Sequence, residues 1–339
     1  MIIEVKHFFQ MFLKKIRAGA GLKSARSSSP SAFHKTIFSI YHKILKRDPN
    51  QDELFHWSYF LDHGMSLMQF KNSLKANYEF DQLRSRNDVT MVKLPAVKMY
   101  CRSSDLDVGN QIIHEQSFEP HVASALRDVL KQGSVFIDLG ANIGYFSLMA
   151  STLVGPAGRI ISIEPNVKNL ELFHASIVEN GMKNIVVLPV AASNSPQILR
   201  LQSFGSNGFL EAPVPGQARA QYIQTVVLDE ILISVPRIDS IKMDIEGYEP
   251  LALQGMLLIL KKHKPVIITE FSPWHIEHRC GLSPQKYLDQ LAALEYGLSI
   301  IEPSGQITSE KSPAAIMEYW VALQNDKMQL DLLAKHVAK

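Results

Sequence analysis

The sequence has too few cysteines for a disulfide framework. Only Cys101 and Cys280 occur in 339 residues, which fits a reducing compartment. No apolar run reaches the roughly 18 residues that suggest a membrane span. The net charge is only +2, so the chain as a whole is not built to bind a polyanion. These absences predict a globular cytoplasmic protein.

Several motifs that would name other enzymes are also missing. There is no G-x-G-x-x-G turn for a dinucleotide and no G-x-x-x-x-G-K-[ST] loop for a triphosphate, which argues against an NAD-dependent oxidoreductase. No N-P-P-Y-like element or basic stripe indicates a nucleic-acid methyltransferase, so no nucleic-acid partner is expected.

Positive charge is concentrated at the start of the chain. Residues 1–30 hold six Lys or Arg against one Glu, a net +5, which leaves −3 for residues 31–339 out of the total of +2. In residues 1–17, phenylalanines stand beside lysines, as in a short amphipathic helix on an anionic membrane surface. A basic tail, or a helix packed on the rest of the protein, is the alternative. Peripheral membrane association through this segment is therefore an open expectation.

Composition divides the chain into four parts. Residues 1–30 form a basic segment that ends in the polar linker "SARSSSPS", and residues 31–90 form a helical module with apolar residues at helical spacing. An α/β domain occupies residues 91–325, and residues 326–339 form a C-terminal tail. The pattern of the helical module resembles a short module of unresolved role in bacterial proteins, sometimes found beside glycan-modifying enzymes. We find no chemistry in it.

Residues 91–325 alternate short β-rich runs with helical runs, which predicts a mostly parallel sheet covered by helices. Strands are expected at 134–139, 159–163, 185–189, 240–243 and 266–270, with two more near 298–302 and 316–322. Helices are expected at 120–130, 144–153, 167–180, 249–260 and 284–296. The Gly- and Pro-containing segment 201–226 predicts a hairpin or loop over the carboxyl edge of the sheet, where open α/β sheets bind ligands.

The stretch "VFIDLGANIGYFS" predicts a cofactor-binding turn. A buried strand ends in Asp138, and Gly140 and Gly144 leave a backbone that a small ligand can approach closely. A carboxylate at this position suits a cationic ligand better than a phosphate, which it would repel by about 1 kcal/mol or more. The alternative is that Asp138 only accepts hydrogen bonds from loop amides.

The next strand, "GRIISIEPN", ends in Glu164, which can accept hydrogen bonds from ribose hydroxyls or merely cap a helix. One acid for a cation and one for a ribose, at neighbouring strand ends, indicate S-adenosylmethionine. After the third strand, small residues leave room for an adenine ring, and Ser193 or Asn194 could reach its polar edge.

A second group of charged residues follows in "IDSIKMDIEGYEPLALQG". Asp244 ends a strand, and Glu246 follows it in a turn. Glu246 and Glu249 could alternatively be favourable charges at the start of the next helix. The stretch "VIITEFSPWH" adds a further strand-end acid, Glu270, and His275 in the loop beyond it. His275 is a candidate base, although a lone loop histidine is more often idle.

In this order, "FIDLGANIGYFSLMAS", "GRIISIEPN", "TVVLDEIL" and "IDSIKMDIEGYEPLALQG…PVIITE" resemble the FkbM family of S-adenosylmethionine-dependent methyltransferases. The resemblance covers roughly residues 115–305. It implies a class I methyltransferase fold, with a seven-stranded sheet whose last strand is antiparallel, and O-methylation of sugar or natural-product hydroxyls. The resemblance also assigns roles to residues: Asp138, Gly140, Asn142 and Gly144 to the loop that binds the methionine part of the cofactor, Glu164 to the ribose, and Lys242, Asp244, Glu246 and Gly247 to a K-x-D-x-E-G element. One residue departs from the family pattern, because Asn194 stands where the family commonly has Asp.

The predicted function is therefore methyl transfer from S-adenosylmethionine to a hydroxyl of a sugar, glycan or natural product. Asp244, Glu246 and His275 are the candidate catalytic residues, because a sugar hydroxyl is a poor nucleophile and benefits from a base. Two carboxylates could instead hold Mg²⁺, which lowers the pKa of an alcohol. A non-catalytic binding or scaffold protein that retains the fold is the alternative function.

Overall fold

The computed structural model describes residues 33–49, 51–62, 65–75, 88–213, 221–323 and 329–337. The chain divides into two compact units, residues 1–87 and residues 88–339. The predicted amphipathic segment 1–17 and the linker 24–31 lie outside the described residues. None of the described helices is long and apolar enough to cross a membrane.

The first unit contains the helices α2 (His34–Leu45), α3 (Gln51–Asp62) and α4 (Leu67–Lys75). Apolar residues spaced three and four apart on α2, such as Ile37 and Tyr41, are buried against Phe70 of α4. The indole nitrogen of Trp57 donates a hydrogen bond of 2.6 Å to the Tyr41 hydroxyl. The helical module expected from the sequence is therefore present, and its third helix is described up to Lys75.

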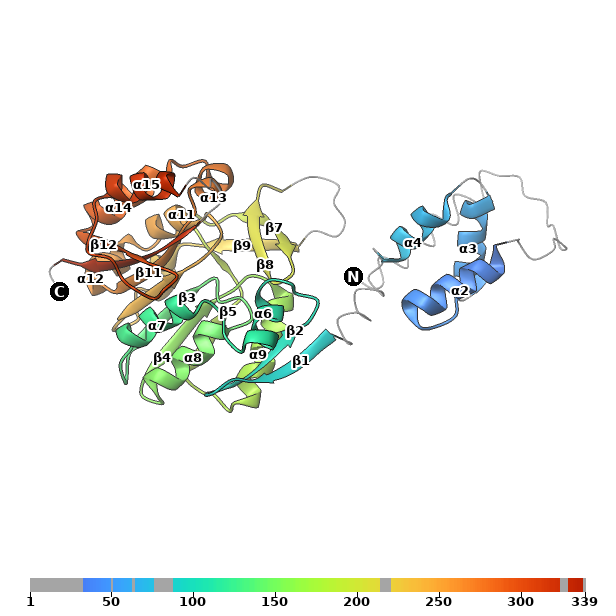
Figure 1. The fold of residues 1–339 in the computed structure, drawn as a ribbon, viewed down its shortest axis with the longest axis horizontal. Coiled ribbons are helices and arrows are strands. Elements are labelled where there is room, and N and C mark those ends of the chain that lie inside the picture. The colour runs from blue at the N-terminus through green and yellow to red at the C-terminus, as the bar shows by residue number, and fades with distance from the viewer. Residues whose placement is uncertain are drawn as a thin grey trace. The chain divides into compact units, whose positions relative to one another are not determined.

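The second unit is built on a seven-stranded sheet in the order β12-β13-β11-β10-β3-β4-β5 (Figure 1). Strands β11, β10, β3, β4 and β5 run parallel to one another. Strand β13 is antiparallel to both of its neighbours, β11 and β12. The bounds are β3 Val135–Leu139, β4 Arg159–Ile163, β5 Ile185–Leu188, β10 Ser240–Met243, β11 Val266–Phe271, β12 Tyr296–Ile301 and β13 Leu330–His336. This confirms the predicted class I methyltransferase fold.

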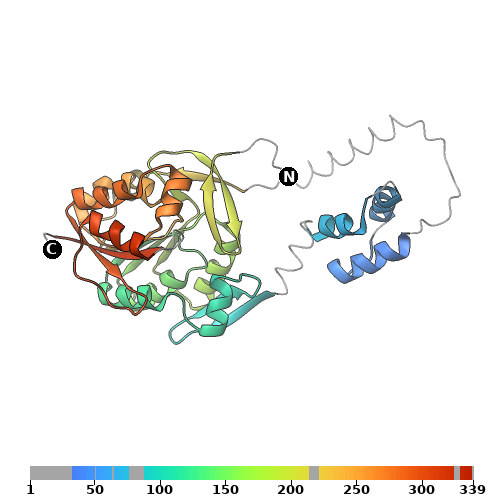
Figure 2. The same cartoon turned by 45° about the horizontal axis from the view of Figure 1, so that its top comes forward.

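Helices cover both faces of this sheet (Figures 1 and 2). Because side chains alternate along a strand, Phe136 packs under α7 (Pro120–Val129) and α8 (Tyr145–Val154), while Ile137 faces the opposite layer. That opposite layer contains α10 (Leu228–Leu232), α11 (Glu249–Gln254), α12 (Leu257–His263), α14 (Pro284–Ala293) and α15 (Pro313–Ala322).

A smaller sheet lies beside the main one, in the order β6-β9-β7-β8. Its strands are β6 Ala191–Ala192, β7 Ile198–Phe204, β8 Asn207–Glu211 and β9 Gln221–Val226. The antiparallel β7–β8 pair confirms the hairpin expected in residues 201–226. The remaining elements are β1 (Val89–Lys93), β2 (Lys98–Arg102), α6 (Val108–Glu115), α9 (Val167–Glu179), α13 (Pro273–His275) and the π-helical turn Ile276–Cys280.

Two predictions near the C-terminus are wrong. The segment 316–322, expected to be a strand, lies in helix α15, where Ser312 accepts a hydrogen bond from the Ala315 amide and Pro313 occupies the first turn. Residues 326–339, expected to be a tail, instead contain β13, the antiparallel strand inserted between β11 and β12. Ser-Pro is a helix-start signal, and giving it that weight would have corrected the first error.

The predicted helix 249–260 is broken into α11 and α12. The break falls at Gly255, where a Cβ would lie 2.1 Å from the Ser193 carbonyl oxygen, so only glycine fits at this position. The new helix is capped by Asp229, whose carboxylate accepts hydrogen bonds from the Leu258 and Ile259 amides.

Candidate active site

A cavity opens at the carboxyl ends of the parallel strands, between the main sheet and the β7–β8 hairpin. With its open mouth included it encloses about 900 Å³. The loops that follow β3, β4 and β10 form its floor. Its lining includes Gly140, Asn142, Phe146, Glu164, Ala191, Ala192, Asn207, Phe209, Lys242, Asp244 and Glu246.

The two glycines of the first loop are required by the protein's own packing. Both have a positive φ, of 79° at Gly140 and 93° at Gly144. A Cβ at Gly140 would lie 1.9 Å from the Asp244 carbonyl oxygen, and one at Gly144 would lie 2.1 Å from the Phe173 ring. Gly140 still lines the cavity, but the close approach that excludes a side chain there is to the loop carrying Asp244.

Asp138 lies beneath the cavity and is not among its lining residues. Its side chain is buried and accepts a 2.6 Å hydrogen bond from the Ser147 hydroxyl, which also contacts Ser162 at 2.7 Å. Burial raises the pKa of Asp138, while the charge of Lys242 on the neighbouring strand acts in the opposite direction. The structure therefore places Asp138 where it ties α8 to the sheet, without direct access to a ligand in the cavity.

Glu164 lines the cavity, as its predicted role requires. Its carboxylate accepts hydrogen bonds from the amides of Asn142 (2.8 Å) and Asn166 (2.7 Å) and from the Asn169 side chain (3.2 Å). Burial raises the pKa of Glu164 to about 7, although these three donors oppose the shift. Three of about four acceptor positions are filled, which leaves room for a further donor such as a ribose hydroxyl.

Asn142 joins the first loop to two other elements. It adopts the left-handed conformation (φ 51°), which asparagine tolerates better than most residues. In addition to its amide bond to Glu164, its side-chain amide donates a 3.0 Å hydrogen bond to Asn207 on the β7–β8 hairpin. Asn142 thus links the loop, the ribose candidate and the hairpin that covers the cavity.

The two residues expected at the adenine edge do not line the cavity. Ser193 is buried and donates its amide to Val226, while Asn194 is exposed and donates to Gln254. Ala191 and Ala192, two residues earlier, do line the cavity. The small residues are placed as expected, whereas the polar side chains after them point elsewhere.

Lys242 and Asp244 form an ion pair at the edge of the cavity. The Lys242 ammonium donates a 2.8 Å hydrogen bond to Asp244 and lies 4.6 Å from the centre of the Phe146 ring. Burial alone would lower the pKa of Lys242, but the carboxylates of Asp244, Glu119 and Asp138 outweigh burial and raise it. The side chain of Asp244 is 27% exposed, so it is accessible from the cavity.

Glu246 is held by Arg279, which the sequence reasoning did not single out. One Arg279 nitrogen donates to both the carboxylate (2.8 Å) and the backbone carbonyl (2.7 Å) of Glu246. The guanidinium also lies 4.3 Å from the centre of the Phe209 ring of the hairpin. Arg279 follows His275 by four residues, and this spacing on a helical turn was the available signal.

His275 lies beside Glu246 but does not line the cavity. Its Nδ1 is 3.4 Å from the Glu246 carboxylate, without the alignment of a hydrogen bond. Burial, followed by the charge of Arg279, lowers the pKa of His275 to about 4, so the imidazole is neutral at pH 7. Because its side chain is also absent from the cavity lining, His275 is not positioned to take a proton from an acceptor bound there.

Two more acids complete the region, the buried Glu249 and the half-buried Glu119. Glu249 accepts hydrogen bonds from the amides of Ile245 and Gly247 in the loop. It also lies in the first turn of α11, the position that the alternative gave it. Glu119, which no sequence motif indicated, begins α7 in a left-handed conformation (φ 41°). Burial raises the pKa of Glu119 to about 8, although Lys242 opposes the shift.

The described residues fit S-adenosylmethionine at this cavity. Glu164 retains acceptor capacity for a ribose, Ala191 and Ala192 leave space for a flat ring, and Asp244 adds a carboxylate to the same lining. The fold and the cavity therefore define a class I S-adenosylmethionine-dependent methyltransferase.

Comparison with known proteins identifies a domain within the chain. Residues 138–305 match the methyltransferase FkbM domain, the same family that the sequence motifs resemble. No curated protein matches the chain.

Several solved structures resemble the chain at low identity. Methyltransferase FkbM from Methylobacillus flagellatus KT has 16% identity and a TM-score of 0.38, over 93% of this chain and 63% of that one. Fibrillarin from Aeropyrum pernix, solved with natively bound S-adenosyl-L-methionine, has 12% identity and a TM-score of 0.39, over 73% of this chain and 94% of that one. Precorrin-6y C5,15-methyltransferase from Geobacter metallireducens GS-15 has 13% identity and a TM-score of 0.36, over 63% of this chain and 86% of that one.

Proposed function

We propose that this methyltransferase modifies a hydroxyl group of a sugar, glycan or other natural product. The observation that carries the proposal is the Lys242–Asp244 pair, which faces the same cavity as the ribose candidate Glu164. A carboxylate beside the cofactor cavity suits an acceptor whose proton must leave as the new bond forms.

In this proposal Asp244 receives the hydroxyl proton and Lys242 orients the Asp244 carboxylate through their 2.8 Å hydrogen bond. When bound, S-adenosylmethionine supplies an activated methyl group, which moves to the acceptor oxygen while the electrons of the carbon–sulfur bond return to sulfur. The remaining requirement is alignment. The hairpin residues Asn207 and Phe209 line the cavity opposite the sheet and would exclude water around the acceptor.

The acceptor is proposed to be a small molecule or glycan and not a nucleic acid. Residues 31–339 carry a net charge of about −3 out of the total of +2, which disfavours a polyanion. The proposed location is the cytoplasm, in keeping with two cysteines that are both free. Contact of residues 1–17 with a membrane surface remains part of the proposal.

The test is methyl transfer from radiolabelled S-adenosylmethionine to a panel of mono- and oligosaccharides and hydroxylated natural products, with Mg²⁺ and with EDTA. Wild-type protein is expected to label at least one hydroxyl acceptor. Asp244→Asn is expected to retain S-adenosylhomocysteine binding and to lose turnover. Asp239→Asn, at the opposite end of the same strand, is the matched control and is expected to behave as wild type. Label on none of the hydroxyl acceptors, or equal turnover by Asp244→Asn, would overturn the proposal.

A further inference from the structure

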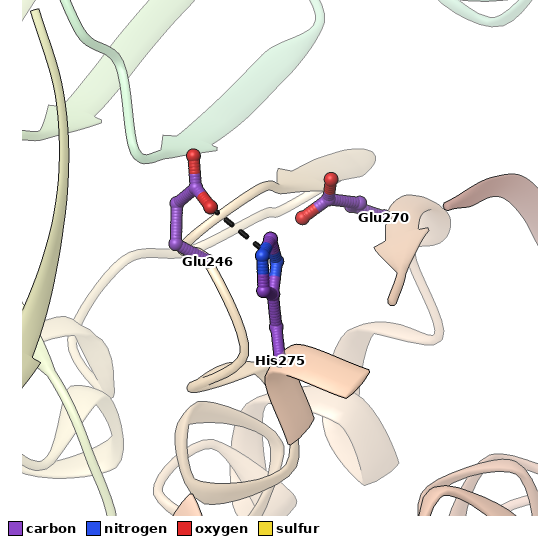
Figure 3. A group of neighbouring side chains, drawn as sticks. All are labelled: Glu246, Glu270 and His275. Carbon is purple, nitrogen blue, oxygen red and sulfur yellow. Dashed lines mark ion pairs between the residues drawn. The ribbon is translucent and has the colours of Figure 1, made fainter. Parts of the chain in front are cut away.

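Three potential metal ligands meet next to the cavity. Glu246 lies in the loop after β10, Glu270 near the end of β11 and His275 in the short helix α13. One ligand atom from each residue lies within 4.8 Å of the other two. Figure 3 shows the Glu246 and Glu270 carboxylates turned toward the His275 ring from two sides.

Glu270 and His275 each have a buried side-chain atom with unmet hydrogen-bonding capacity. Glu270 is only 6% exposed, yet its Oε2 has no hydrogen-bond partner among the described residues. The Nδ1 of His275 is likewise buried without one. Leaving a buried polar group unpaired costs about 1–3 kcal/mol, and more for a charged group. Native structures contain few such groups, so two of them within one cluster of potential ligands suggest a missing partner.

The carboxylates around these atoms are only partly matched by cations. The negative groups that act on Glu270 are Asp244, Glu249, Glu246 and Asp331. Among the described residues, Lys242 pairs with Asp244, Arg279 with Glu246 and His121 with Asp331. None of the ion pairs among the described residues includes Glu270, so a cation beside it would be favourable.

We propose that Glu246, Glu270 and His275 bind a divalent transition-metal ion. The carboxylates alone suggested Mg²⁺, but Mg²⁺ strongly prefers oxygen ligands and gives up its water reluctantly. A set of two carboxylates and one imidazole nitrogen suits ions such as Mn²⁺ or Zn²⁺ better. The 3.4 Å between His275 Nδ1 and the Glu246 oxygen is a suitable separation for two ligands of one ion.

Arg279 is compatible with this site. It donates to the same Glu246 oxygen that faces His275, at 2.8 Å. A carboxylate oxygen carries two lone pairs, so it can accept from Arg279 and coordinate an ion at once. Outer-shell partners of this kind fix the orientation of metal ligands, and Arg279 is therefore a positioning residue.

The role of the ion rests on the proposed function. Glu246 and Asp244 both line the cavity, so an ion held by Glu246 would stand within reach of the acceptor hydroxyl. As a Lewis acid it would lower the pKa of that hydroxyl, and the proton would pass to Asp244. His275 would then serve as a ligand in place of the expected base.

The test uses full-length protein stripped of metal with EDTA and then exchanged into chelator-free buffer. Mn²⁺ binding is followed by electron paramagnetic resonance and Zn²⁺ binding by calorimetry. Wild type is expected to bind one equivalent. Glu270→Gln and His275→Gln are expected to weaken binding at least about tenfold. His278→Gln, an exposed histidine on the adjoining turn, is the matched control and should bind as wild type.

Circular dichroism verifies that each variant is folded, and only folded variants are scored. Failure of folded wild type to bind either ion would overturn the site, as would Glu270→Gln and His275→Gln binding like wild type. Methyl transfer is assayed separately, with and without EDTA. If the protein binds Mn²⁺ but methylates no hydroxyl acceptor, the metal site is supported and the proposed function is overturned. If it methylates fully in EDTA and binds no ion, the metal site alone is overturned.

Discussion

Gly140 offers a quantitative test of how the cofactor loop is packed, because the chain contains a matched glycine. Gly140 and Gly133 share a φ of +79°. A Cβ at Gly133 would have nothing within 4 Å, whereas one at Gly140 would lie 1.9 Å from the Asp244 carbonyl oxygen. The loss of stability in Gly133→Ala therefore measures backbone strain alone. In Gly140→Ala the collision of the new Cβ with the Asp244 carbonyl oxygen is added to that strain.

The two costs can be estimated separately. The left-handed conformation costs a residue with a Cβ roughly 1–2 kcal/mol. Forcing additional atoms into a packed region costs typically about 1–3 kcal/mol more. Gly133→Ala should thus lower the free energy of unfolding by about 1–2 kcal/mol, and Gly140→Ala by about 2–5 kcal/mol. Gly140→Ala should also reduce turnover, since the loop that must move carries Asp244.

The assay is urea unfolding followed by circular dichroism, with methyl transfer measured on the folded proteins. Equal losses of unfolding free energy for the two variants would show that strain alone accounts for Gly140. That result would refute the packing of the first loop against Asp244.

Two further predictions concern single contacts. Hydrogen bonding to Asp331 raises the pKa of His121 despite partial burial, so its contribution to stability is present below the unfolded value of about 6.5 and is lost as pH rises through the folded pKa. His121→Gln should therefore destabilise the protein at about pH 5.5 and have much less effect at about pH 9, and equal losses of melting temperature at the two pH values would contradict this. Tyr287→Phe removes a buried 2.7 Å hydrogen bond to the Thr269 hydroxyl, so it should cost about 1 kcal/mol in urea unfolding, and a stabilised variant would be inconsistent with that bond.

The parallel part of the sheet could be predicted from the sequence because its signal is local. A buried strand followed by an acid recurs at Asp138, Glu164 and Asp244, and the structure gathers these three strand ends at one edge. Periodicity could not show that β13, far along the chain, inserts beside β11. That pairing depends on long-range contacts that no short window of sequence contains.

The site was predicted in type more than in detail. A strand-end carboxylate was expected to touch the cofactor, but Asp138 shares a sheet face with Ser162 and Lys242 and is covered by α8. Asn194 lies just past β6, and a displacement of two residues from Ala192 is enough to turn its side chain toward Gln254. The approach of His275 to Glu246 depends on the path of the chain after β11, which residue types alone do not predict.

The most direct test of the central claim is a calorimetric titration of S-adenosylhomocysteine into the wild-type protein and into Glu164→Ala. We predict one binding site in the wild type and a clearly weakened one in the folded variant, because Glu164 lines the cavity and organises the loop through Asn142. Absence of binding to the wild type, or equal affinity of the two proteins, would contradict the assignment of this cavity to the methyl donor.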